Sequence, residues 1–129
     1  MNAGGALPVE LTDVYLAGAR RDIEVLERGL EDARADPARW PGVRQRLREV
    51  THNIKGQGTS FGYPLMTRIG QSLSDLLKAA EEGEPGSLRL AGAHVAAMRA
   101  VLDHDIVGEG GEPGRALVGR LEALVGKLS

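Results

Sequence analysis

The feature that most constrains the fold of this chain is a hydrophobic repeat of about 3.6 residues that continues along almost its whole length. Apolar side chains recur at steps of three and four residues, and no segment alternates as a β-strand does. Clusters of proline and glycine divide the repeat into separate segments. The pattern therefore predicts helices over about residues 10–35, 41–61, 65–80, 88–102 and 117–128.

Short connections between amphipathic helices are typical of an all-α fold, and here they predict an antiparallel up-and-down four-helix bundle with an additional short C-terminal helix. We expect residues 1–10 to be disordered or to form a short N-terminal segment, and residues 11–129 to form a single bundle domain. The length of 129 residues suffices for one hydrophobic core. Because aromatic residues make up only 3% of the chain, aliphatic side chains must fill most of that core.

Composition excludes several classes of function. The sequence contains no cysteine, which excludes disulfides, thiolate metal ligands and thiol catalysis. The formal net charge of −2 argues against nucleic acid as the main ligand, because phosphate backbones bind to basic surfaces. No apolar run approaches the roughly 20 residues that span a bilayer, and the start of the chain does not read as a secretory signal. We therefore expect a cytoplasmic protein without a membrane segment.

The most informative motif is the segment HNIKGQGTSFG, residues 52–62, within the second predicted helix. At about 100° per residue, His52 lies almost opposite the apolar stripe of that helix, so its ring should face away from the core. Lys55 follows one turn later, and Gly56 occupies the fourth position, where any side chain would crowd the imidazole. Each glycine costs a helix roughly 1 kcal/mol relative to alanine, so we expect Gly56 and Gly58 to keep the ring accessible. The apolar stripe comprises Val43, Leu47, Val50, Ile54 and Phe61.

An exposed histidine beside a lysine suits phosphoryl transfer. A neutral imidazole offers a nucleophilic ring nitrogen, while a hydrogen bond to the other nitrogen fixes the tautomer. The ammonium group of Lys55 would stabilise the charge on the transferred phosphoryl oxygens. No metal site or phosphate-binding loop is needed on this chain if a partner supplies Mg²⁺.

These residues resemble the signature of the histidine-containing phosphotransfer (HPt) domains of phosphorelays, which are related to the phosphorylated domain of chemotaxis kinases. The resemblance covers about residues 11–102, and the spacing of apolar residues in the third predicted helix is similar as well. The matching positions are His52, Ile54, Lys55, Gly56, Phe61 and Gly62, with Gly58 and Ser60 as small residues between them.

The resemblance implies a phosphorelay intermediate in two-component signal transduction. His52 would accept a phosphoryl group on Nε2 from a receiver-domain aspartyl phosphate, or pass it to another response regulator, and Lys55 would stabilise the phosphohistidine. The tautomer of the ring would be held by Gln71, which we favour for its length, by the shorter Ser74, or by water. Nothing in the chain resembles an ATP-binding domain, so we expect a phosphoryl carrier without kinase activity of its own.

The expected partners are response-regulator receiver domains and a hybrid sensor kinase. We expect the chain itself to be a monomer. Docking should use the small and apolar surface around His52, including Thr59 and Tyr63, and Arg48 would attract an acidic partner. A second hypothesis is a non-phosphorylated bundle that binds and inhibits a receiver domain or a histidine kinase. Such an inhibitor would need neither His52 nor Lys55.

The sequence gives little support to a metal site. Glu49 and His52 have the spacing found in di-iron bundles, but those sites need two inward-facing copies. The three histidines show no paired spacing, so we expect no zinc site. His94 lies at the edge of the apolar stripe of its helix, where a hydrogen-bonded structural histidine is expected.

Overall fold

The computed structural model describes residues 9–128 of the chain, and over these residues it is all-helical, as the sequence predicts. No strand occurs among the described residues, and none of their helices is long and apolar enough to cross a membrane. The helices are α1 (Val9–Ala35), α2 (Trp40–Gln57), α3 (Pro64–Ala79), α4 (Pro85–Asp103) and α5 (Gly111–Gly126), with two short 3-10 helices, η1 (Pro37–Arg39) and η2 (Thr59–Phe61).

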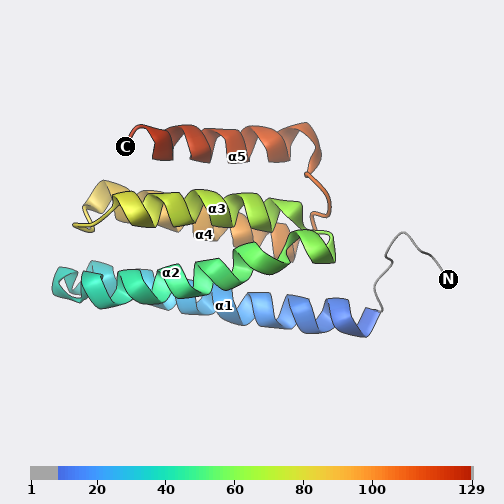
Figure 1. The fold of residues 1–129 in the computed structure, drawn as a ribbon, viewed down its shortest axis with the longest axis horizontal. Helices are drawn as coiled ribbons and strands as arrows, with labels where there is room; N and C mark the ends of the chain where they lie inside the picture. The colour runs from blue at the N-terminus through green and yellow to red at the C-terminus, as the bar shows by residue number, and fades with distance from the viewer. Residues whose placement is uncertain (1–8, 129) are drawn as a thin grey trace.

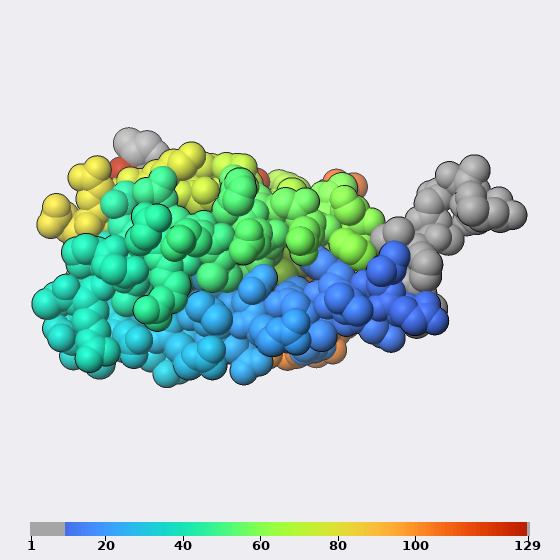
Figure 2. Space-filling model, turned by 60° about the horizontal axis from the view of Figure 1, so that its bottom comes forward, coloured from blue at the N-terminus to red at the C-terminus, as the bar shows by residue number. Residues whose placement is uncertain are grey.

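The first four helices close a ring around the core. α1 packs against α2 and α4, and α3 packs against the same two helices from the other side. Successive helices run in opposite directions along the long axis of the molecule (Figure 1). α5 lies outside this ring, where it packs mainly on α3 and also touches α4. Figure 2 shows the face on which α1 and α2 lie side by side, with α3 along one margin.

The core is aliphatic over most of its length, as expected from the composition. The fully buried side chains include Ile23 of α1, Leu47 of α2, Leu73 of α3 and Met98 of α4. Val118, Leu121 and Val125 of α5 are also buried, so the outer helix extends the core. Burial of a large aliphatic side chain contributes about 1.5–3 kcal/mol to folding, and the ring is held chiefly by this packing.

Several helix boundaries differ from the sequence prediction. α1 begins at Val9, so residues 9 and 10 are helical rather than part of a separate segment, while residues 1–8 lie outside the described residues. α2 ends at Gln57, earlier than the predicted end near residue 61. α5 begins at Gly111 and spans 16 residues, so it is longer than the short helix that we expected.

The end of α2 is set by contacts that a helical pattern does not reveal. The amide of Tyr63 donates to the carbonyl of Gly58 at 2.9 Å, and the amide of Thr59 donates to Thr67 Oγ1 at 2.9 Å. Gly62 then adopts a φ of +88°, which favours glycine. These bonds turn the chain from α2 into α3 within the second half of the histidine motif.

At the opposite end of α2, two side chains hold the end of α3. Trp40 Nε1 donates to the carbonyl of Ala80 at 2.9 Å, and Arg44 Nε donates to the carbonyl of Leu77 at 2.7 Å. The last carbonyls of a helix have no partner within it, so donors from α2 satisfy them here. α2 and α3 are therefore joined by hydrogen bonds at both ends.

Candidate functional site

His52 is exposed on the outer face of α2, as the sequence predicts. The residues of the predicted stripe face inward: Val43, Leu47 and Ile54 are buried, while Val50 and Phe61 are partly buried against the core. The imidazole therefore projects from a helix whose opposite side is anchored. A second protein can reach the ring without any change in the bundle.

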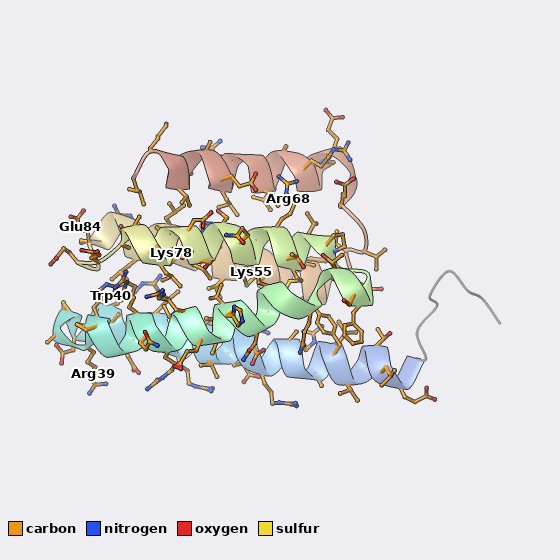
Figure 3. The ribbon with its side chains drawn as sticks, in the orientation of Figure 1. Arg39, Trp40, Lys55, Arg68, Lys78 and Glu84 are labelled. Atoms are coloured by element: carbon orange, nitrogen blue, oxygen red, sulfur yellow. The ribbon has the colours of Figure 1, made fainter. Side chains whose placement is uncertain are left out.

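The ring lies on a cleft of about 510 Å³ between α2 and α3. Arg48 and Lys55 of α2 and Lys78 of α3 bring three positive charges to this cleft, against one carboxylate from Glu49. Among the described residues, none of these three cations is engaged in an ion pair within 4.0 Å. Figure 3 shows Lys55 and Lys78 along the α2–α3 seam. The remaining lining residues are Gln45, Asn53 and Ser74.

This cleft is suited to an anion that is held by charge and not by a closed pocket. An ammonium or guanidinium group near a transferring phosphoryl group stabilises its oxygens. The structure thus brings together His52, Lys55, Arg48 and Ser74 from the sequence prediction. Lys78 is an addition that the prediction missed, although its position four residues after Ser74 places both on one face of α3.

Gln71 does not belong to this group. It lies on the flank of α3 that faces α5, where its Nε2 donates to Asp75 Oδ1 at 2.9 Å. The cavity that it lines also contains Glu122 and Val125 of α5. The structure therefore does not support our preference for Gln71 over Ser74 as the partner of the imidazole, because Gln71 lines the cavity beside α5 and not the cleft of His52. Ser74 is the residue that shares the cleft with His52.

Gly56 and Gly58 of the motif have different structural roles. A Cβ on Gly56 would meet nothing within 4 Å, so the expectation that any side chain there would crowd the imidazole is wrong for the first carbon. Gly56 lines a groove of about 440 Å³ between α1 and α2, beside Gly18 and Phe61. A Cβ on Gly58 would lie 2.7 Å from Thr67 Oγ1 and 2.8 Å from the carbonyl oxygen of Tyr63. Gly58 is therefore required by the tight turn and not by access to the ring.

The predicted docking residues differ in their exposure to solvent. Arg48 and Thr59 are exposed, Arg48 in the cleft and Thr59 at the start of η2. Tyr63 is 3% exposed and stacks on Tyr15, so its assignment to the docking surface is wrong. Its hydroxyl donates to Asp105 Oδ1 at 2.5 Å. Burial, together with this carboxylate, raises the pKa of Tyr63 to about 12.

His94 is a structural histidine. It is fully buried in α4, with Nε2 2.8 Å from Ser72 Oγ and Nδ1 2.7 Å from the carbonyl oxygen of Leu90. Burial lowers its pKa below the ordinary 6.5. Among the described residues, no group of three or more histidine, aspartate or glutamate side chains is placed to hold a metal ion.

A comparison with protein families gives one finding. The family model described as Hpt domain matches residues 10–106, which include α1 from its second residue, the whole of α2–α4 and the histidine motif, and exclude α5. Neither the search of curated proteins nor the search of solved structures gave a match.

Proposed function

Because the chain belongs to the Hpt domain family of two-component signalling, we propose that it is a phosphorelay intermediate. In this proposal His52 accepts a phosphoryl group from the aspartyl phosphate of a receiver domain and passes it to another response regulator. The partners are response-regulator receiver domains and a hybrid sensor kinase, met in the cytoplasm. The chain acts as a monomer in which α1–α4 form the antiparallel four-helix bundle, and it has no kinase activity of its own.

The observation that carries the proposal is the position of His52. Its ring is exposed, while the opposite face of α2 is anchored in the core. It shares a cleft with Lys55, Arg48 and Lys78, all of them cations without an ion-pair partner among residues 9–128. A histidine that served only the fold would be bonded and enclosed, as His94 is.

The chemical step requires little from the carrier beyond a positioned nitrogen. The lone pair of Nε2 attacks the phosphorus of the acyl phosphate, so that an N–P bond forms while the bond from phosphorus to the carboxylate oxygen breaks. The aspartate leaves as a carboxylate, and Nδ1 keeps the ring proton. Donation to the next regulator is the same exchange in reverse. Mg²⁺ on the receiver domain, and not on this chain, would supply further charge neutralisation.

Two residues of the cleft support the ring and the charge. Lys55 lies one turn from His52 and brings an ammonium group to the developing negative charge. Ser74 lies across the seam, and we propose that it orients the ring through Nδ1, either directly or through a bridging water.

The test is transfer of label from a ³²P-phosphorylated receiver domain to the purified chain. The wild type should acquire an acid-labile, base-stable label, and His52→Gln should acquire none. His104→Gln is the matched control, because His104 is also exposed, at the end of α4. A wild-type chain that binds the receiver and takes no label would instead support the inhibitor hypothesis. Label that persists in His52→Gln would exclude His52 as the carrier.

A further inference from the structure

Gly70 stands in the middle of α3, in a place where glycine weakens a helix relative to alanine. It is buried, and it faces α2 at the level of Lys55. A Cβ built on Gly70 would lie 3.4 Å from both Cα and Cβ of Lys55 and 3.5 Å from its Cγ. Apart from the neighbouring residues and backbone of its own helix, the three atoms nearest to this Cβ therefore all belong to Lys55.

From this contact we propose that Gly70 is a positioning residue for Lys55. The missing side chain on α3 leaves a shallow site in which the first carbons of the lysine stem lie. The inference rests on the proposed function, because it assigns to α3 the placement of the ammonium group that the phosphoryl transfer uses.

The burial of Lys55 agrees with this assignment. Lys55 is half-buried, whereas His52 and Gly56 on either side of it in the same helix are exposed. A lysine commonly packs its aliphatic stem on a neighbouring surface and keeps the ammonium group in water. Here the stem lies against α3 at Gly70, and Lys55 also lines the cleft on which His52 lies. Fixing the stem reduces the volume in which the charge moves.

The distances also define how large a residue the position accepts. At 3.4 Å a single added carbon makes ordinary van der Waals contact, so alanine should fit without displacing Lys55. A side chain with carbons attached to Cβ extends further toward the stem of Lys55. Valine must therefore push the lysine stem away from α3, and with it the ammonium group.

The first test measures the lysine itself and needs no phosphotransfer. A water-soluble amine-acylating reagent is applied to the folded chain, and acylation of each lysine is followed by mass spectrometry of peptides. Gly70→Val should raise the acylation rate of Lys55 several-fold relative to Lys127, an exposed lysine outside the cleft. Gly70→Ala should leave the ratio unchanged. Gly119→Val is the control for valine in a helix, because a Cβ on Gly119 meets nothing within 4 Å.

The second test is a double-mutant cycle on the transfer rate. Gly70→Val should slow transfer to His52 by roughly tenfold to a hundredfold, as expected for a misplaced catalytic group, and Gly70→Ala should not. In a Lys55→Met background, Gly70→Val should then have less than about a twofold further effect, because the charge that it displaces is already absent.

The outcomes separate the two proposals. Equal slowing by Gly70→Val with and without Lys55 would show a general packing defect and overturn the positioning role, as would unchanged acylation of Lys55. A wild-type chain that takes no label on His52 would refute the proposed function, while the acylation rates would still decide whether Gly70 places the lysine. Circular dichroism confirms that each compared variant is folded, and Gly70→Ser replaces Gly70→Val if the latter is not.

Discussion

Ser72 on α3 and His94 on α4 form a buried hydrogen bond of 2.8 Å across the core. The carbonyl of Leu90 can only accept, so Nδ1 of His94 carries the proton and donates to it at 2.7 Å. Nε2 is then the acceptor for the hydroxyl of Ser72. Both ring nitrogens are satisfied in the neutral state, and protonation would place a charge in the core.

This bond predicts that the fold weakens in mild acid. Burial lowers the pKa of His94 in the folded state, so the unfolded chain binds more protons at this residue. Stability should be constant well above pH 6.5, the ordinary value, and should fall as the pH decreases through 6.5 toward the lowered folded pKa. Urea denaturation at several pH values measures this slope, and His94→Gln should flatten it. An identical slope in that variant would assign the pH dependence to other groups.

Gly83 should be intolerant of a side chain. Its φ is +62°, and a Cβ would lie 2.5 Å from Cγ of Trp40, the only tryptophan of the chain. Gly83→Ala should destabilise the protein by about 2–3 kcal/mol through backbone strain and overpacking. Gly42→Ala is the comparison, because a Cβ there meets nothing within 4 Å, and it should be neutral or stabilising by up to about 1 kcal/mol. Chemical denaturation followed by Trp40 fluorescence measures both. Equal stabilities of the two variants would contradict the packing of the turn on the indole.

Lys78 should contribute to phosphoryl transfer although it lies on a different helix from His52. It lines the same cleft and adds a positive charge near the expected phosphoryl group. Because the side chain is exposed, we expect a loss of only about three- to tenfold in the transfer rate of Lys78→Met, and a smaller loss at high salt. Lys127→Met removes an exposed lysine outside the cleft and should leave the rate unchanged. Equal rates for the two variants would remove Lys78 from the site.

Substitution of Gly56 tests whether a receiver domain approaches His52 over this part of α2. Since a Cβ at this position meets nothing within 4 Å, Gly56→Leu should keep the unfolding free energy within about 1 kcal/mol of the wild type. The added side chain would nevertheless occupy space next to His52 that an approaching receiver domain needs. Transfer from the receiver should slow by at least about tenfold, corresponding to roughly 1.4 kcal/mol, while Gly56→Ala should be close to wild type. Unimpaired transfer in Gly56→Leu would place the partner on another side of the ring.

The hydrophobic repeat predicted the helices well, because each helix is stabilised by the burial of one of its faces. The exposure of His52 followed from the same argument, since a residue opposite a buried stripe must face outward. The end of α2 was missed because Gly58 is fixed by atoms of Thr67 and Tyr63, which come later in the chain. The hydrophobic repeat shows which face of a helix is buried, but it does not show which residues of another segment lie against that face.

The errors in the site have a similar origin. Gln71 and Ser74 differ by about 60° around α3, and the choice between them depended on which flank α5 covers. The packing of α5 on α3 was not part of the prediction. Tyr63 was assigned to the docking surface around His52, yet it stacks on Tyr15, which is 48 residues earlier in the chain. Gly70 and Lys78 were missed for the same reason, since their proposed roles depend on which residues of α2 lie near them.

The solitary placement of His52 on one side of α2 also determines the order of events in the proposed relay. A single imidazole that is accessible from one side cannot contact a donor domain and an acceptor domain at the same time. The two domains must therefore bind in turn. Steady-state exchange should therefore follow a ping-pong scheme, with parallel double-reciprocal plots and a phosphorylated carrier that can be isolated between encounters. Competing regulators would then be selected by the rates at which they reach that intermediate.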